Sequence, residues 1–172
     1  MRIVILGSGG FISGVVQEKL EKLNVSILPI SRKQLDLTKK NSFKKLLKKI
    51  KRNDRVFFVA AEAPVKNEKM LINNLLISEN ICKVIKKITP AHLLYLSSDA
   101  VYADSSDLLS ENSCAEPSSI HGIMHYAREI MLKNIYKGKI CIVRPTLVYG
   151  KNDPHNGYGP NRFIKLAKKG KN

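Results

Sequence analysis

The chain has 172 residues, of which 44% are hydrophobic and 26% are charged. This length and balance are typical of one globular domain and exclude a disordered chain. The apolar stretches are far shorter than the roughly 20 residues that span a bilayer, and the N-terminus lacks a basic segment followed by a cleavage site. We therefore expect a soluble, cytoplasmic protein that does not enter a membrane.

The formal net charge of +16 raises the question of a nucleic-acid partner. Much of the excess is lysine in helical segments such as 39–52, where apolar residues form one stripe and lysines cover the rest. Nucleic-acid-binding segments interleave aromatic residues or direct arginines toward bases, and this segment does neither. We predict no nucleic-acid partner, although the charge can attract a substrate that carries phosphate.

Cysteine usage points away from metal clusters and disulfides. Cys82, Cys114 and Cys141 show no paired spacing. Neither a zinc cluster nor a disulfide framework is indicated. We expect all three side chains to be reduced and buried.

Short apolar runs alternate with helix-period segments along the whole chain. We predict strands at 2–6, 25–30, 55–60, 92–97 and 139–144, a further short strand at 34–37, and helices at 13–22, 42–51, 70–87 and 119–137. Nearly continuous apolar runs are typical of parallel strands buried on both faces. The alternation predicts one α/β domain over residues 1–172, with a doubly wound, Rossmann-like parallel sheet of about six strands and helices on both faces. Residues 152–160 read as a loop before a final basic helical turn or two.

The opening strand runs directly into the segment Gly7-Ser-Gly-Gly-Phe-Ile12 and then into a helix. Gly7 allows a tight turn, Gly10 removes a Cβ that would keep a phosphate away, and the helix N-terminus faces the anion. In this strand-to-helix context the glycines predict a dinucleotide diphosphate site. An ordinary tight turn is the alternative.

Other candidate residues follow the later strands, where an open α/β sheet binds its ligand. Arg32 stands where NAD-binding domains often carry an acid, so it favours the 2′-phosphate of NADP, with a surface arginine as the equal alternative. Ala60 and Ala61 are small enough for close approach of a cofactor. Ser98 can donate a hydrogen bond to a substrate carbonyl or cap the next turn.

Taken in order, these motifs resemble the extended short-chain dehydrogenase/reductase family, the NAD-dependent epimerase/dehydratase group that acts on nucleotide sugars. The segments that carry the resemblance are Gly7 to Ile12, Asp36-Leu37, Ala60-Ala61, Asn74, Ser98 to Tyr102, Arg144-Pro145 and Val148 to Gly150. The resemblance implies an NAD or NADP cofactor held by Gly7, Gly10, Phe11, Ile12, Arg32, Asp36, Leu37, Ala60, Ala61 and Asn74. It also implies a catalytic role for Ser98.

The family's catalytic Tyr and the Lys four residues later are replaced here by His121 and His125. Imidazole titrates near neutrality, so His121 can take the proton-transfer role, and His125, one turn on, can hydrogen-bond the nicotinamide ribose. Tyr126 lies one position off this helix face and cannot replace the Tyr. The alternative is that the chemistry is lost and both histidines line a pocket or a packed face.

Histidines four residues apart also suggest a metal pair, but no Glu follows His121 and no third ligand is evident, so we expect no metal. Ser13 occupies the third glycine position, where we expect slight packing strain. Asp99 is followed by Ala100, whereas the family's dehydratases have Asp-Glu, so water elimination lacks its base.

The resemblance therefore favours an NAD(P)-dependent epimerase or reductase of a nucleotide sugar, with hydride transfer and with Ser98 and His121 at the reacting carbon. A catalytically silent dinucleotide-binding or sensor module is the alternative. The family's smaller C-terminal substrate domain is missing from this chain, which we interpret as truncation or as the lack of a full substrate pocket. A homodimer through the helices next to His121 is a further implication.

Overall fold

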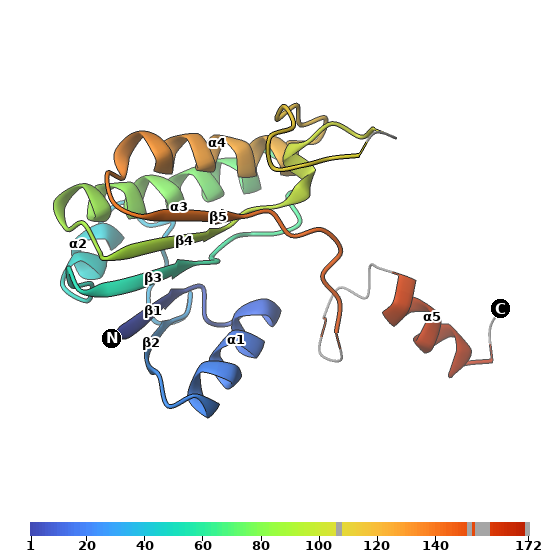
Figure 1. Ribbon diagram of the computed structural model, residues 1–172, viewed down its shortest axis with the longest axis horizontal. Helices are drawn as coiled ribbons and strands as arrows, with labels where there is room; N and C mark the ends of the chain where they lie inside the picture. The colour runs from blue at the N-terminus through green and yellow to red at the C-terminus, as the bar shows by residue number, and fades with distance from the viewer. Residues whose placement is uncertain (106–107, 151–152, 154–158, 171–172) are drawn as a thin grey trace.

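Five parallel strands form the centre of the computed structural model, which describes all residues except 106–107, 151–152, 154–158 and 171–172 (Figure 1). The strands are β1 Arg2–Leu6, β2 Ser26–Ile30, β3 Asp54–Phe58, β4 His92–Leu96 and β5 Ile140–Val143. They pair in parallel in the order β2-β1-β3-β4-β5. The predicted α/β class with a doubly wound parallel sheet is confirmed.

Helices cover both faces of this sheet. They are α1 Phe11–Lys22, α2 Ser42–Leu47, α3 Glu68–Lys87, α4 Ile120–Ile135 and α5 Gly159–Ala167, with a short 3₁₀ helix, η1, at Asp99–Val101. Figure 1 shows α3 and α4 on one side of the sheet and α1 on the other. Asn67 and Ser119 cap α3 and α4, because their side-chain oxygens accept the backbone N–H groups of Met70 and Gly122 at 3.0 and 3.1 Å.

The predicted strand at 34–37 is wrong, so the sheet has five strands where about six were expected. The Asp36 carboxylate accepts both the backbone N–H and the hydroxyl of Thr38, which turns the chain locally. The Leu37 carbonyl accepts a hydrogen bond from the Asn80 side chain on α3, at 2.9 Å. Leu37 thus reaches the core from a turn held by side chains and not from a strand.

Other predicted boundaries differ by a few residues. The helix predicted at 42–51 ends at Leu47, and the last helix, α5, begins at Gly159. Of the loop predicted at 152–160, residues 152 and 154–158 lie outside the described residues. None of the described helices is long and apolar enough to cross a membrane.

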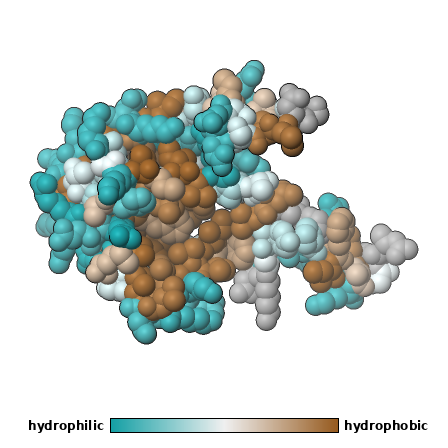
Figure 2. All heavy atoms as spheres, viewed as in Figure 1, coloured by the Kyte–Doolittle hydropathy of each residue, from teal (hydrophilic) through white to brown (hydrophobic). Residues whose placement is uncertain are grey.

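Burial on both faces holds for the inner strands and fails at the edge. Val4, Ile5 and Leu6 of β1 are fully buried, whereas β5 alternates half-buried and exposed residues, and Val143 is 37% exposed. On the face of the sheet opposite α3 and α4, helix α1 packs beside β2 and lies far from β5, so it does not cover β5. Figure 2 shows hydrophobic residues gathered in the middle of this view and hydrophilic residues along the outer rim.

The same pattern corrects the expectation for the cysteines. Cys82, on α3, is buried in the core, but Cys114 and Cys141 are exposed. Cys141 lies on β5, in the part of the sheet that the helices cover least. Only Cys82 therefore matches the predicted burial.

Candidate cofactor and catalytic site

The strand order reverses between β1 and β3, and ligands of open α/β sheets bind at such a switch point. Gly7 follows β1 there, with φ of 101°. A Cβ on Gly7 would lie 2.6 Å from both the backbone nitrogen and the Cα of Ala60, which follows β3. The carbonyl of Ile30 at the end of β2 accepts the N–H groups of Gly7 and Ser8, at 2.9 and 3.2 Å. Only glycine fits this junction of three strands.

Ser13, in the third glycine position, ties the loop to α1. Its buried hydroxyl lies 2.8 and 3.0 Å from the carbonyls of Gly7 and Gly10 and accepts the Gly10 N–H at 3.1 Å. A hydroxyl can donate and accept at once, so this serine holds the loop where we expected only slight strain. The first turn of α1 contains no acidic residue, which leaves its positive end open to an anion.

Two more residues of the predicted cofactor set begin α1. The Phe11 ring lies next to Gly150, where a Cβ would approach it to 2.9 Å, and Ile12 is half-buried. The beginning of α1 therefore packs against the segment that follows β5.

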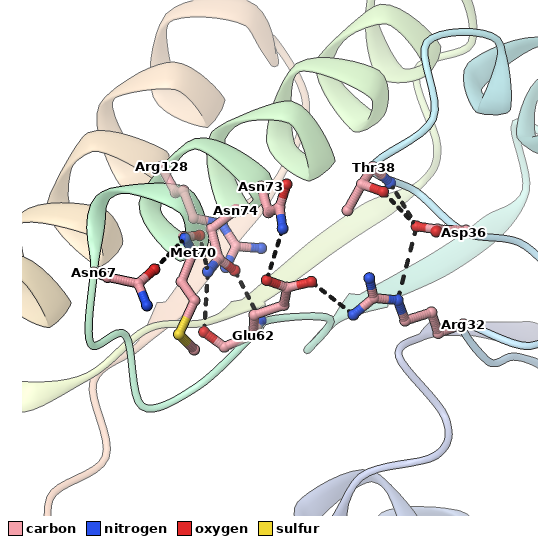
Figure 3. Close-up of polar contacts among 9 residues, drawn as sticks. All are labelled: Arg32, Asp36, Thr38, Glu62, Asn67, Met70, Asn73, Asn74 and Arg128. Atoms are coloured by element: carbon pink, nitrogen blue, oxygen red, sulfur yellow. Dashed lines mark hydrogen bonds and ion pairs between the residues drawn. The ribbon is translucent and has the colours of Figure 1, made fainter.

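A polar cluster joins the ends of β2 and β3, as Figure 3 shows. The Arg32 guanidinium donates to the Glu62 carboxylate at 2.6 Å and lies 3.9 Å from the Asp36 carboxylate. The second oxygen of Glu62 accepts from Asn73 of α3 at 2.9 Å. Sequence reasoning singled out Arg32 and Asp36 but missed Glu62, whose signal was an acidic residue directly after Ala60-Ala61.

Asn74, also predicted to contact the cofactor, is fully buried and holds the chain after β3. Its side chain accepts the Glu62 N–H and donates to the Glu62 carbonyl, both at 3.0 Å, and it also donates to the Met70 carbonyl at 2.8 Å (Figure 3). The amide group of Asn74 thus positions the backbone that carries Ala61 and Glu62. The side chain of Leu37 is likewise committed to the hydrophobic core.

Ser98 follows β4 and caps η1. Its hydroxyl accepts the Ala100 N–H at 3.1 Å and donates to the Asp99 carboxylate at 3.2 Å. A Cβ on Gly122 would overlap the Ala100 carbonyl oxygen, so α4 begins in direct contact with η1. This close approach places His121, the residue before Gly122, beside the segment that carries Ser98.

His121 is half-buried, and its Nδ1 accepts the backbone N–H of Val65 at 3.3 Å. In the neutral ring the proton therefore lies on Nε2. Burial lowers the pKa of His121; Asp99 acts against this shift and Arg128 adds to it. The ring is thus neutral near pH 7 and has one N–H to offer.

His125 lies deeper. It is 5% exposed, its Nδ1 is 2.8 Å from the Tyr95 hydroxyl, and its ring meets the His121 ring edge to face with centroids 4.8 Å apart. Burial, followed by Arg128 and His121, lowers the pKa of His125 to about 2. Nδ1 is occupied by Tyr95, so only Nε2 is left for a ribose hydroxyl.

Arg128, which sequence reasoning missed, is fully buried behind the histidines. It donates to the Ser78 hydroxyl and to the Ala60 carbonyl, both at 2.7 Å, and lies 4.4 Å from the Phe58 ring centroid. Within the described part of the chain, no carboxylate lies within ion-pair distance of it. Its position seven residues after His121, on the same helix face, was the available signal.

A buried ion pair lies on the other side of α4. The Glu129 carboxylate is fully buried and accepts from Arg144 at 2.7 and 3.0 Å and from the Ser97 hydroxyl at 2.6 Å. Hydrogen bonding to Glu129 raises the pKa of Arg144. Among the described residues, no group of three or more His, Cys, Asp or Glu side chains could hold a metal ion.

Comparison with known proteins identifies the family to which the chain belongs. Residues 3–171 match the family model described as the NAD dependent epimerase/dehydratase family. The chain belongs to this family. The resemblance found in the sequence is thereby confirmed, and so is NAD or NADP as the kind of cofactor its members use.

Solved structures share the fold at low identity. The dTDP-4-dehydrorhamnose reductase of Clostridium acetobutylicum is 23% identical, with a TM-score of 0.83 over 98% of this chain and 60% of that chain. The Bacillus anthracis reductase of the same name, solved with NADP, is 26% identical with a TM-score of 0.80 over 98% and 60%. The UDP-glucose 4-epimerase of Thermotoga maritima, solved with UDP-glucose, is 20% identical with a TM-score of 0.84 over 99% and 64%.

This family member thus spans 60% to 64% of the length of those three structures. No curated protein matches it in sequence. The family and the fold rest on the match over residues 3–171 and on the shared architecture.

Proposed function

We propose that this chain binds NAD or NADP and forms the cofactor-binding part of a nucleotide-sugar reductase or epimerase. The observation that carries the proposal is Gly7, whose positive φ and missing Cβ bring the loop after β1 against Ala60 at the switch point of the sheet. The amides of this loop and the first turn of α1, which contains no acidic residue, would hold the diphosphate. The residues present therefore fit a dinucleotide.

When bound, the cofactor would supply or accept a hydride at a sugar carbon. In our proposal Ser98 donates a hydrogen bond to the oxygen on that carbon, and His121 passes its Nε2 proton to that oxygen as the hydride arrives and regains a proton from water. Val65 occupies Nδ1 of His121, so Nε2 is the nitrogen that faces this task. His125 would bond the nicotinamide ribose through its own Nε2, because Tyr95 occupies its Nδ1.

A silent dinucleotide-binding module is the second candidate. The observation in its favour is the near-complete burial of His125, which is bonded to Tyr95 and therefore acts as part of a packed face. This candidate keeps the glycine loop and its cofactor but assigns no proton transfer to His121.

Turnover of a keto-sugar nucleotide separates the two. The substrate to try is dTDP-4-dehydrorhamnose, because reductases of that compound are among the similar structures. Oxidation of NADH or NADPH is followed at 340 nm for the wild type, His121→Phe and a control, His92→Gln, which changes a histidine at the amino end of β4, away from the site. Cofactor binding is measured in parallel by calorimetry.

We expect His121→Phe to lower turnover at least about 100-fold, the usual contribution of a positioned acid or base, with cofactor binding retained. The control should keep both. Equal turnover in the wild type and His121→Phe would remove His121 from the mechanism. Binding without turnover in the wild type would favour the silent module, and no binding of either cofactor would refute the proposed function.

A further inference from the structure

The ion pair between Glu62 and Arg32 changes how Arg32 is interpreted as a cofactor-binding residue. Arg32 follows β2 next to Ser31, whose Cβ lies 4.0 Å from the position a Cβ would take on Gly9. In this fold an acid at the end of the second strand binds the adenosine ribose hydroxyls of NAD, whereas an arginine accommodates the 2′-phosphate of NADP. Taken alone, Arg32 favours NADP.

The guanidinium of Arg32 is already engaged by acids. Glu62 bonds it at 2.6 Å, and the Asp36 carboxylate is 3.9 Å away (Figure 3). Two carboxylates therefore stand around one cation that is itself 63% exposed. The charge of Arg32 is thus offset by carboxylates, so this guanidinium is not a free cation at the end of β2.

Glu62 is also fixed in place. Its side chain is 16% exposed, and its second oxygen accepts from Asn73 at 2.9 Å. Asn74 holds both the N–H and the carbonyl of Glu62 from the buried side. The carboxylate cannot turn away from Arg32 without losing the bond to Asn73, so the ion pair is a built feature of the loop after β3.

A 2′-phosphate carries about −1.5 to −2 charges near pH 7. To bond Arg32 it would have to displace Glu62 or lie beside two carboxylates that repel it. The free 2′-hydroxyl of NAD is instead a donor, and a carboxylate is an acceptor.

We propose that Glu62 is a specificity-determining residue that makes this chain prefer NAD(H) over NADP(H). The inference rests on the proposed function, because it assumes that a dinucleotide lies along the glycine loop. It assigns the discrimination to a residue after β3, paired across the site with the arginine after β2.

The test is calorimetric titration of the purified protein with NADH and with NADPH, for the wild type, Glu62→Gln and Glu79→Gln. Glu79 is the matched control, since it forms an exposed ion pair with Lys83 along α3 and its change removes the same charge elsewhere. Thermal melting shows that each variant is folded. Binding, and not turnover, is the readout.

The wild type should bind NADH about tenfold more tightly than NADPH. Glu62→Gln should raise NADPH affinity about fivefold, the effect of one partly exposed charge pair, and change NADH affinity by less than about twofold. Glu79→Gln should leave the ratio unchanged. Tighter binding of NADPH by the wild type, or a ratio that Glu62→Gln does not alter, would overturn the role of Glu62. A wild type that binds neither nucleotide overturns the proposed function and this inference together.

Discussion

Replacement of Gly7 by alanine tests the junction on which the cofactor site is built. The residue has φ of 101°, a region in which an L-residue pays about 1–2 kcal/mol. The added Cβ would also lie 2.6 Å from the nitrogen and the Cα of Ala60. Because these are backbone atoms, the ends of β1 and β3 must move apart, and overpacking of this kind costs about 1–3 kcal/mol. We expect Gly7→Ala to lower the free energy of unfolding by about 2–5 kcal/mol.

Gly14→Ala is the matched control. Gly14 lies within α1, and a Cβ there would meet no atom within 4 Å. Alanine is favoured over glycine in a helix by about 0.8–1 kcal/mol, so this variant should be more stable than the wild type by up to that amount.

Guanidinium unfolding of the three proteins, followed by far-UV circular dichroism, measures both changes in the free energy of unfolding. The comparison holds when the three proteins share the same dependence of this free energy on denaturant concentration. A Gly7→Ala protein destabilised by less than about 1 kcal/mol would refute the close packing of the loop on Ala60. A destabilised Gly14→Ala protein would show that the loss comes from substituting any glycine near the loop.

Two further predictions concern buried ionisable side chains. The pKa of His125 is about 6.5 in the unfolded chain and about 2 in the folded protein, so below pH 6.5 the unfolded chain binds a proton that the folded protein does not. The free energy of unfolding is therefore highest above pH 6.5 and falls by about 2 kcal/mol between pH 7 and pH 5. Unfolding of the wild type and of His125→Phe at several pH values measures this, and equal pH dependence in both would contradict it. Glu129→Gln should lower the free energy of unfolding by about 2–3 kcal/mol, because Arg144 loses its buried carboxylate partner. Glu116→Gln, at an exposed position, is the control, and an equal decrease in both variants would rule out a special role for the Glu129–Arg144 pair.

The parts of the fold that follow local patterns were predicted from the sequence. The run at 2–6 is strand β1 with the predicted bounds, because residues 3–6 are apolar without interruption and a glycine-rich segment follows. The segment at 34–37 alternates polar and apolar residues as a short strand can, but it is not a strand, since the Leu37 carbonyl accepts a hydrogen bond from Asn80 of α3. No local pattern shows which side chain will arrive from more than forty residues away.

The site shows the same division. The glycine loop was found because its turn needs glycine locally, whereas the ion pair of Arg32 with Glu62 depends on the ends of β2 and β3 lying on either side of β1. The sequence left open whether Arg32 binds a phosphate or lies free on the surface. The structure shows a third arrangement, an arginine bound by an acid of the same site.

The presence of two histidines in place of Tyr and Lys changes what the site requires of a nearby cation. A phenol with a pKa of about 10 needs a nearby cation to give up its proton near neutrality, but an imidazole with a pKa of about 6.5 does not. His125, with a pKa of about 2, carries no charge, and the cation next to His121 is the buried Arg128. Burial and this cation lower the pKa of His121, so the ring is neutral at neutral pH, and because Val65 occupies Nδ1 the single proton lies on Nε2 as a hydrogen-bond donor. The catalysis we propose therefore requires a substrate oxygen that accepts a hydrogen bond, and a keto sugar meets that requirement.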